Sequence, residues 1–337
     1  MTTAVSIATV LDRLVGKIRD SPLEALSPRI EMSFISAHLA RYPRIDVLQK
    51  FIADVEKIKV SGGEPIVDRI APGVTSIDTL RAPALAALPL IHSEAIRARD
   101  ERRLMISSLT NTGGMRTLNA WMRLLAEDGL VSIMSWNGGP YAVLPTGSLD
   151  AFFGTNPLAY GIPCNPSPIV GDFATSEIAF MDLQGARRER RDLPLGAGID
   201  SAGLPTVDPE SVFVPPDSAR LLPMGGGPKG SALMLLLEYL TGALTGGAMG
   251  RAASPEHIPH EFTGLLLAFP EGLFRESSAV RNEVSTMVDE IRKSRTIPGT
   301  TQVRIPGDQP DYRSSDQAVI TLSDDTAAAL GLSGNGG

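Results

Sequence analysis

Apolar residues recur at helical spacing in two stretches near the start of the chain. Side chains three and four positions apart share one face of a helix, so we predict that residues from about 4 to 58 are mostly helical. Between residues 60 and 80 the pattern becomes extended, with turns at Gly62-Gly63 and Pro72-Gly73. The two helical series are Val5, Ile7, Val10, Leu11 and Leu14, then Ile45, Val47, Leu48, Phe51, Ile52 and Val55.

Helix and strand patterns alternate over the rest of the chain. An Ala- and Leu-rich helix spans about residues 82–99, and Pro89 is expected to kink or split it. Short strands separated by Gly and Pro turns are predicted from 154 to 208. The remaining predicted elements are a strand at 104–106, a turn at 111–114, a helix to Asp128 closed by Gly129, a strand at 130–135, an apolar helix at 229–245, a strand at 262–269 and an amphipathic helix at 277–293. One α/β assembly fits this order better than separate domains on linkers.

Charge and composition exclude several classes of protein. A net charge of −7 and a pI near 5.2 argue against a nucleic-acid partner, which requires a basic face. We see no signal peptide, and the most apolar stretch, Ser231–Gly242, contains Glu238 and is shorter than the ~20 residues that cross a bilayer. We therefore expect a soluble, cytoplasmic protein with a small-molecule substrate. With one cysteine, Cys164, and four histidines, we expect no metal site.

The usual nucleotide-binding fingerprints are missing. The segment Gly225-Gly226-Gly227-Pro228-Lys229-Gly230 has the wrong spacing for a Walker loop. It leaves two interpretations open. Free N–H groups at a helix N-terminus beside a lysine favour a phosphate, whereas the same glycines also suit a plain turn before a core helix.

Five short motifs nevertheless occur in an order that resembles one known family, the malate/L-lactate dehydrogenase-like oxidoreductases. The similarity covers about residues 104–310. The motifs are Phe153-Gly154-Thr155-Asn156-Pro157-Leu158-Ala159, Asp172-Phe173-Ala174-Thr175-Ser176, the run from Asp200 to Pro209, the run from Leu221 to Gly230, and Ile305-Pro306-Gly307-Asp308. The fourth has one extra residue before its lysine, and the fifth has Asp308 where the family has glutamate.

This resemblance implies a fold, an assembly and a reaction class. The fold is α/β and non-Rossmann, with a mostly antiparallel or mixed cofactor-binding sheet flanked by helices and an N-terminal helical region. The assembly is a homodimer with the active site at the subunit interface, and the reaction is hydride transfer between NAD(P)H and a C=O or C=N carbon beside a carboxylate. We accordingly expect an N-terminal dimerisation and substrate region (1–100), an NAD(P)-binding α/β domain (101–260) and a C-terminal strand–helix region (261–337).

The family's early S-H-G segment matches this chain only in part. His38 is kept, but Ala37 and Leu39 replace the serine and glycine. The resemblance makes His38 the proton donor, a role that suits a side chain titrating near working pH. The arginine spacing is one residue short, so either Arg41 or Arg44 grips the substrate carboxylate. A helix-end histidine without function is the competing interpretation of His38.

Two further departures bear on the substrate. Asn111 stands where hydroxy-acid members have a second histidine, and asparagine cannot shuttle a proton. Asp182 stands where many of them have lysine, and the ketimine-reducing branch is similar in having an aspartate near this point. A carboxylate beside His38 favours the imidazolium form and attracts a cationic iminium. A solvated turn residue is the alternative for Asp182.

The resemblance also assigns the remaining binding residues. Thr155 and Asn156 are expected at the substrate. NADPH is favoured over NADH, because the run Arg187–Arg191 offers charge for a 2'-phosphate; a solvated face is the alternative. Trp121 and Trp136 are expected to pack in the core. The expected cofactor-binding residues are Asn111, Thr112, Gly113, Gly114, Asp172, Phe173, Ala174, Lys229, Gly230, Pro306 and Gly307.

Together these features predict an NAD(P)H-dependent reductase of a small 2-imino (cyclic ketimine) or 2-oxo carboxylic acid. A role in a specialised biosynthetic pathway is a further hypothesis. A 2-hydroxy-acid dehydrogenase of the malate or lactate type is one alternative. A family member that has lost catalysis and acts as a binding protein is another.

Overall fold

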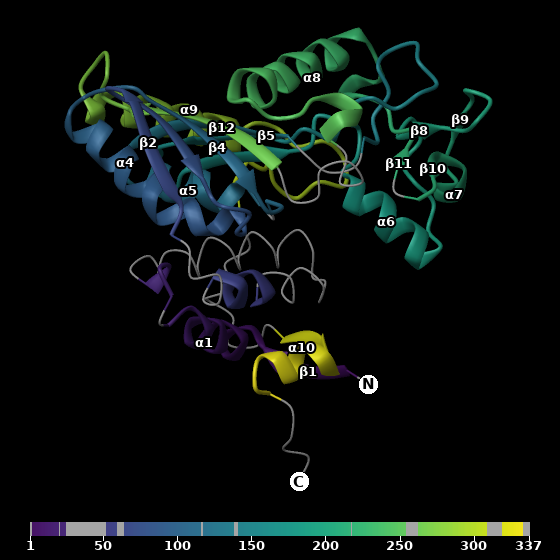
Figure 1. The fold of residues 1–337 in the computed structure, drawn as a ribbon, viewed down its shortest axis with the longest axis horizontal. Coiled ribbons are helices and arrows are strands. Elements are labelled where there is room, and N and C mark those ends of the chain that lie inside the picture. Colours follow the sequence, from purple (N-terminus) through teal and green to yellow (C-terminus); the bar gives the residue numbers. More distant parts are fainter. Residues whose placement is uncertain are drawn as a thin grey trace.

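A seven-stranded mixed sheet forms the centre of the molecule, with strand order β2-β3-β4-β12-β5-β6-β7 (Figure 1). Its neighbouring strands are antiparallel except for β3 and β4, which are parallel. The computed structural model describes residues 2–19, 21–24, 52–58, 64–115, 117–137, 141–216, 218–253, 262–308 and 319–332. The strands are β2 (Ile66–Ala71), β3 (Val74–Asp78), β4 (Met105–Thr112), β5 (Leu130–Asn137), β6 (Leu158–Ile162), β7 (Ile169–Phe173) and β12 (Phe262–Pro270).

Strand β12 lies between β4 and β5 and pairs with both. Leu266 and Ala268 are completely buried there. A glycine is required at Gly264, because a Cβ at that position would come within 2.2 Å of the Trp136 ring. The last long strand of the sheet in sequence is therefore one of its innermost strands.

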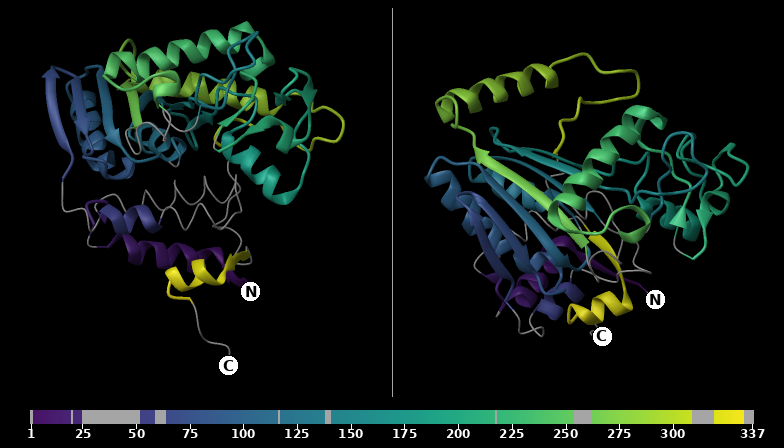
Figure 2. Two further views of the ribbon diagram at one scale, coloured as in Figure 1. Left: turned by 45° about the vertical axis from the view of Figure 1, so that its right-hand side comes forward. Right: turned by 45° about the horizontal axis from the view of Figure 1, so that its top comes forward.

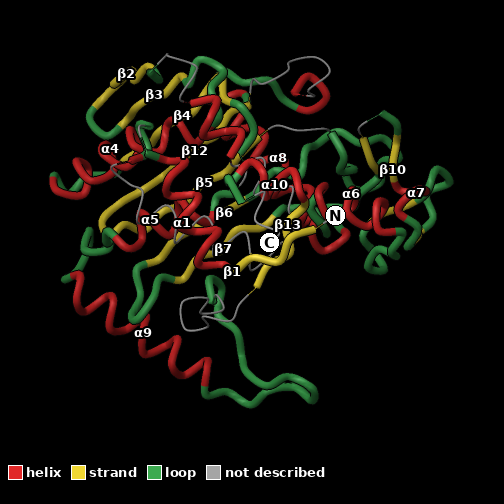
Figure 3. The backbone as a smooth tube through the Cα atoms, turned by 90° about the horizontal axis from the view of Figure 1, so that it is seen from below, coloured by secondary structure: helices red, strands yellow, loops and turns green. Residues whose placement is uncertain are grey.

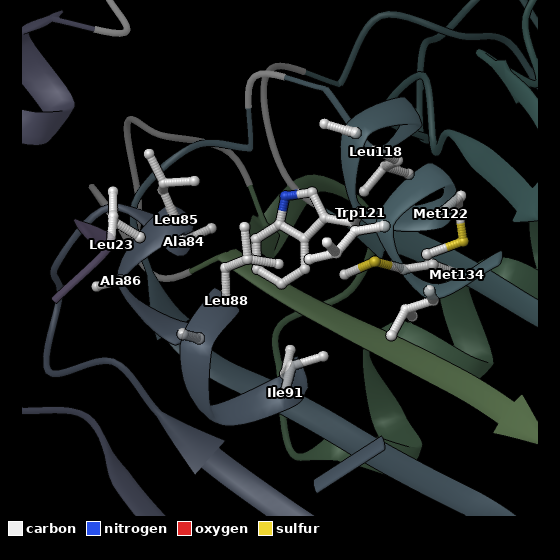
Figure 4. Close-up of a cluster of buried hydrophobic side chains, with 14 of the residues drawn as sticks. Leu23, Ala84, Leu85, Ala86, Leu88, Ile91, Leu118, Trp121, Met122 and Met134 are labelled. Carbon is white, nitrogen blue, oxygen red and sulfur yellow. The ribbon is translucent and has the colours of Figure 1, made fainter. Parts of the chain in front are cut away.

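Helices cover both faces of the sheet (Figures 1 and 2). The 3-10 turn η2 (Ala84–Ala87), α4 (Leu88–Asp100) and α5 (Asn119–Glu127) lie on one side, and α8 (Pro228–Thr241) lies on the other. Trp121 of α5 is fully buried against Leu88 and Ile91 of α4 and Met134 of β5 (Figure 4). Trp136 is 4% exposed, so both tryptophans pack in the interior as expected. Burial of such large side chains dominates the energetics of a core.

The two ends of the described chain pair with each other beyond α4 and α5. Strand β1 (Thr2–Ser6) pairs antiparallel with β13 (Val319–Ser323). Helix α1 (Ile7–Ile18), a helical stretch at 52–58 and α10 (Asp324–Ala329) lie beside them. Val10, Leu14 and Ile18 are fully buried in the same apolar cluster as α4 and α5.

Short elements form a smaller lobe at one end of the sheet, with an apolar cluster of its own that includes Leu183, Val212 and Met234. Helix α9 (Ser277–Arg292) packs through Val288 on Cys164 and Ile169, along the β6–β7 edge (Figure 3). The lobe contains α6 (Phe180–Glu189), β8 (Gly198–Ile199), β9 (Pro205–Thr206), α7 (Pro209–Val212), β10 (Phe213–Val214), β11 (Ser218–Ala219) and η3 (Met224–Gly226); η4 (Ala243–Thr245) and η5 (Gly250–Ala253) follow α8.

Most of the expected elements are confirmed, including the mixed sheet, the split before Pro89 and the closure of α5 by Gly129, which has φ +79°. Three expectations were wrong. Residues 2–6 form a strand, because they pair with residues more than 300 positions away. Asn111 and Thr112 belong to β4 and not to a turn, and residues 180–189 form α6. No helix in the described parts of the chain is long and apolar enough to cross a membrane.

Candidate functional site

Thr175 joins three of the sequence motifs. Its backbone N–H donates to the carbonyl of Thr155 at 2.9 Å, and its hydroxyl donates to the carbonyl of Asn156 at 2.9 Å. Its own carbonyl accepts the N–H of Met224 at 2.8 Å, at the start of the glycine segment. Thr175 itself is fully buried. The Gly154–Pro157 turn, the end of β7 and the N-terminus of α8 thus converge on one point.

Asp172 holds the start of α5 from the neighbouring strand. Its Oδ2 accepts the backbone N–H of Leu118 at 3.1 Å and of Asn119 at 3.0 Å, and the hydroxyl of Thr117 at 3.1 Å. A carboxylate at a helix N-terminus satisfies N–H groups that lack partners within the helix. Phe173 and Ala174, which follow it, are half-buried.

Asn156 and Glu238 form a buried polar pair behind the Gly154–Pro157 turn. The Asn156 Nδ2 donates to Glu238 Oε1 at 3.0 Å, and the side chains are 0% and 3% exposed. Asn156 has φ +33°, in the left-handed region that few residues other than glycine adopt. Burial raises the pKa of the Glu238 carboxyl, and the N–H groups of Asn156, Gly250 and Gly154 partly oppose that rise.

Residues 111–114 lead from the end of β4 toward Asp172. Asn111 has φ +49°, and its Nδ2 donates to Asp78 Oδ2 at 2.8 Å. The Thr112 hydroxyl donates to the carbonyl oxygen of Phe262 at 3.1 Å. The N–H of Gly113 donates to the carbonyl oxygen of Ala82 at 2.8 Å. These polar atoms hold β4 to its neighbours, while Gly114 is half-buried beside them. The segment ends three residues before Thr117, whose hydroxyl donates to the Asp172 carboxylate.

The N-terminus of α8 has the features of an anion site. Gly225 and Gly226 have φ of +74° and +61°, and open space surrounds both. Gly230 must be a glycine, because a Cβ there would lie 2.2 Å from the carbonyl oxygen of Met224. Lys229 is exposed in the first turn, which contains no acidic residue. N–H groups and a cation at a helix start suit a phosphate, so the pyrophosphate of a dinucleotide fits these residues.

Pro306 and Gly307 fasten the chain to the outer edge of β7. The carbonyl of Pro306 accepts the N–H of Val170 at 3.1 Å, and that of Gly307 accepts Arg123 Nη2 at 2.8 Å. Arg123 is only 9% exposed, and burial lowers the pKa of its guanidinium below the ordinary value. Both carbonyls thus have partners within the protein, and contact between these residues and a cofactor stays a prediction.

Asp182 lies in the first turn of α6, where the helix dipole stabilises a negative charge. It lies in a helix rather than in a turn and is half-buried, and its role at the substrate stays a prediction. Arg187, at the other end of α6, forms a bidentate pair with Glu210, and its Cζ lies 3.6 Å from the centre of the Phe213 ring.

His38, Arg41 and Arg44 lie outside the described residues, so a contact between His38 and Asp182 stays a prediction.

Sequence reasoning missed two residues that organise the site. Thr175 was part of a quoted motif but had no role assigned to it. Glu238 was noted only as an interruption of an apolar stretch. That interruption was the available signal, because a single carboxylate on a buried helix needs donors around it.

The mixed, mostly antiparallel sheet defines an α/β protein of the non-Rossmann kind. The family model for malate/L-lactate dehydrogenase matches residues 45–330, so the chain belongs to the malate/L-lactate dehydrogenase family of NAD(P)-dependent oxidoreductases.

Individual relatives agree with that assignment. The chain is 34% identical over 251 residues to a Delta(1)-pyrroline-2-carboxylate/Delta(1)-piperideine-2-carboxylate reductase from Pseudomonas syringae pv. tomato, covering 73% of this chain and 69% of that protein. It is 29% identical over 238 residues to an NAD(+)-dependent ureidoglycolate dehydrogenase from Escherichia coli O157:H7, covering 68% and 66%.

A solved structure extends the similarity over nearly the full length. The delta1-piperideine-2-carboxylate reductase from Pseudomonas syringae superposes with a TM-score of 0.74 at 28% identity and covers 98% of this chain and 99% of that one. A malate dehydrogenase from Entamoeba histolytica has a TM-score of 0.79 at 19% identity, which supports the fold alone.

Proposed function

We propose that this protein reduces a small cyclic 2-imino carboxylic acid, or the corresponding 2-oxo acid, with NADPH or NADH. The observation that carries the proposal is the 34% identity with a pyrroline- and piperideine-2-carboxylate reductase. Asp182 supports it, because a carboxylate attracts a cationic iminium where a lysine would repel it. A role in a specialised biosynthetic pathway is part of the same proposal.

The proposed chemistry divides between the cofactor and the chain. When bound, the nicotinamide supplies a hydride for C2 of the substrate. His38, oriented by Asp182, gives the proton to the substrate nitrogen or oxygen, and Arg41 or Arg44 holds the carboxylate. Thr155 and Asn156 form the turn at the substrate. Substrate and proton donor are thereby aligned before transfer, which lowers the barrier.

The proposed cofactor site lies between the end of β4, the end of β7 and the start of α8. Asp172 to Ala174 and Asn111 to Gly114 border it, with Pro306 and Gly307 behind β7. Lys229 and Gly230 offer a cation and free N–H groups for phosphate. NADPH stays the preferred cofactor in this proposal, with the run Arg187–Arg191 as the source of charge for a 2'-phosphate. Within that run Arg187 pairs with Glu210 and Arg191 with Glu189, so a bound phosphate would compete with these carboxylates.

A homodimer with its active site at the subunit interface completes the proposal. Helix α8 begins at the proposed phosphate site and exposes an apolar face: Leu235 is 63% exposed, Leu236 51%, Tyr239 54%, and Leu244 just beyond the helix 55%. Adjacent exposed apolar side chains of this size mark interaction surfaces. We propose a cytoplasmic location for this dimer.

Fluorescence titration with NADPH and NADH, followed by cofactor oxidation, tests the proposal. Addition of piperideine-2-carboxylate should oxidise the cofactor faster than pyruvate or oxaloacetate does. His38→Ala and Asp182→Asn should remove this activity, while Asp192→Asn, the same change on an exposed loop, should keep it. Failure to bind either cofactor would contradict the proposal and favour the alternative of a binding protein.

Oxidation of a 2-hydroxy acid is the second candidate. Ureidoglycolate, malate and sulfolactate dehydrogenases are among the similar proteins, with identities of 29%, 30% and 33%. Asn111 weighs against this candidate, since its amide cannot take a proton from a hydroxyl group and is bonded to Asp78. Rapid reduction of NAD(P)+ by malate, lactate or ureidoglycolate would favour it over imine reduction.

A further inference from the structure

The Glu238 carboxylate collects hydrogen bonds from separate segments of the chain. It accepts Asn156 Nδ2 at 3.0 Å on Oε1, and the backbone N–H of Gly250 at 3.1 Å and Asn137 Nδ2 at 3.4 Å on Oε2. The backbone N–H of Gly154 also donates to it. These four donors come from the end of β5, from both sides of Thr155 and from the start of η5. All are neutral, and the carboxylate is 3% exposed.

Donors of this kind offset the cost of burying the carboxylate. An ionised group taken out of water is destabilising unless it is hydrogen-bonded. Gly154 and Asn156 lie outside any helix or strand, so no regular backbone pairing fixes their conformation. Their hydrogen bonds to the Glu238 carboxylate fix it instead. Loss of the acceptor would take away the partner of the buried Asn156 Nδ2 and of the buried Gly250 N–H, and an unpaired buried donor is destabilising.

Asn156 needs this support more than its neighbours do. Its φ of +33° is unfavourable, and its Oδ1 is buried without a hydrogen-bond partner. Strained conformations persist where the surroundings over-determine them, and they cluster at functional sites. Two contacts hold Asn156: its Nδ2 bonds to Glu238, and its carbonyl accepts the Thr175 hydroxyl at 2.9 Å. Thr155, the residue placed next to the substrate, lies between the two segments that Glu238 holds.

We propose that Glu238 is a positioning residue of the active site, which fixes the Gly154–Asn156 turn from behind so that Thr155 meets the substrate in one orientation. Glu238 acts through Asn156 and the Gly154 amide and does not touch the substrate. The inference rests on the proposed reductase function and adds a determinant of substrate binding that lies outside the recognised motifs, on the buried side of α8.

Two substitutions separate positioning from simple support of the fold. Glu238→Gln places an NH2 group among N–H donors and removes one acceptor oxygen, with almost no change in size. Glu238→Asp keeps both oxygens but withdraws them by one methylene group. Glu290→Gln is the matched control, because Glu290 is an exposed carboxylate on another helix, α9. Circular dichroism and urea unfolding establish that each variant is folded at the assay temperature.

Hydrogen exchange gives a readout that does not depend on turnover. In Glu238→Gln the amides of Gly154 and Gly250 should exchange faster than in the wild type, while amides in β4 and β12 keep their protection. Binding of pyrrole-2-carboxylate, a planar unreactive analogue, should weaken by about tenfold or more, as small misplacements of a binding group do. The Kd for NADPH should change by less than about twofold, since the α8 N-terminus is not altered.

Steady-state kinetics complete the test. With piperideine-2-carboxylate, Glu238→Gln should lower kcat/KM by about tenfold or more, mainly by raising KM, and Glu238→Asp should restore part of the loss. Glu290→Gln should match the wild type. If a folded Glu238→Gln keeps kcat/KM and analogue binding within about twofold, or loses NADPH and analogue binding equally, the positioning role is overturned. Failure of the proposed function is distinct, because the wild type itself would then neither turn over the imine nor bind its analogue.

Discussion

The Asp172 carboxylate at the end of β7 accepts the backbone N–H of Leu118, 54 residues earlier in the chain, at 3.1 Å. Asn119, the first residue of α5, donates to the same oxygen at 3.0 Å. The N-cap position itself, Leu118, has no side chain able to do this. A strand therefore provides the cap that the helix lacks. The arrangement ties the segment after Asn111–Gly114 to the segment before Thr175, the two borders of the proposed cofactor site.

Removal of this cap should destabilise the protein even when no cofactor is bound. Asp172→Ala leaves two N–H groups and one hydroxyl without their acceptor, so we expect a loss of about 1–2 kcal/mol in the free energy of unfolding. Urea denaturation measures it. Asp192→Ala, on an exposed loop, should change the same quantity by less than about 0.5 kcal/mol. Equal stabilities of the two variants would show that the cap contributes nothing.

Alanine substitution at two glycines should separate backbone strain from crowding. Gly307 and Gly299 have φ of +93° and +84°, so a side chain strains both. A Cβ on Gly307 would lie 2.8 Å from the backbone N of Val170, whereas open space surrounds Gly299. Gly299→Ala should cost about 1 kcal/mol from strain alone. Gly307→Ala should cost clearly more and should speed amide exchange along β7. Similar unfolding free energies for the pair would contradict the close contact.

The raised pKa of Glu238 predicts a pH dependence of stability. Between its ordinary value of 4.5 and the higher native value, the folded state binds more protons than the unfolded state. The contribution of this group to the free energy of unfolding is therefore fully present below pH 4.5 and is lost as pH rises through the native pKa. It changes by about 1.4 kcal/mol for each pH unit by which the two values differ.

Urea unfolding of the wild type and Glu238→Gln from pH 4 to 8 measures this effect. The difference in unfolding free energy, wild type minus variant, should decline with rising pH and then level off. Glu290→Gln, compared in the same way, should show no such decline. A difference that increases with pH would mean that the N–H donors outweigh burial and lower the native pKa.

The apolar face of α8 predicts how the proposed dimer responds to charge. Leu235→Glu places a carboxylate on that face, so the assembly should dissociate to monomers at micromolar concentration, because an unpaired charge within an apolar interface is costly. Sedimentation velocity measures this. Leu195, on the loop after α6, is 83% exposed, and Leu195→Glu should leave the assembly unchanged. A dimer that withstands Leu235→Glu would place the interface elsewhere.

The fold was predictable where local patterns decide it. Apolar runs located β12 and α8, an amphipathic pattern located α9, and Gly129 marked the end of α5. Pairing partners were not predictable from periodicity. Residues 2–6 fit a helical pattern as well as a strand, and only β13 determines their conformation. Helix α6 was missed because its 10 residues include Gly185 and a run of charges, which weaken the apolar signal.

For the site, the sequence indicated which segments matter better than what their side chains do. Thr155, Asn156 and Asp172 were all expected to contact ligands. In the structure the Asp172 carboxylate caps α5, and the Asn156 amide turns inward to Glu238. Motif resemblance locates the segments that form a site, but it does not separate a residue that touches a ligand from one that supports the backbone behind it. That distinction depends on burial and hydrogen-bond partners, which only the packed structure supplies.

The central position of β12 has a consequence for how the molecule forms during synthesis. Strands β4 and β5 are complete by residue 137, but the strand that joins them begins at Phe262. Until the ribosome has released that segment, the two halves of the sheet have no hydrogen-bonded link and expose unpaired edges, which invite aggregation. Assembly of the sheet is therefore a late event, governed by contacts far apart in sequence, and slow folding follows from such topology. A chain cut just before residue 262 would yield two unjoined sheets rather than a smaller working domain.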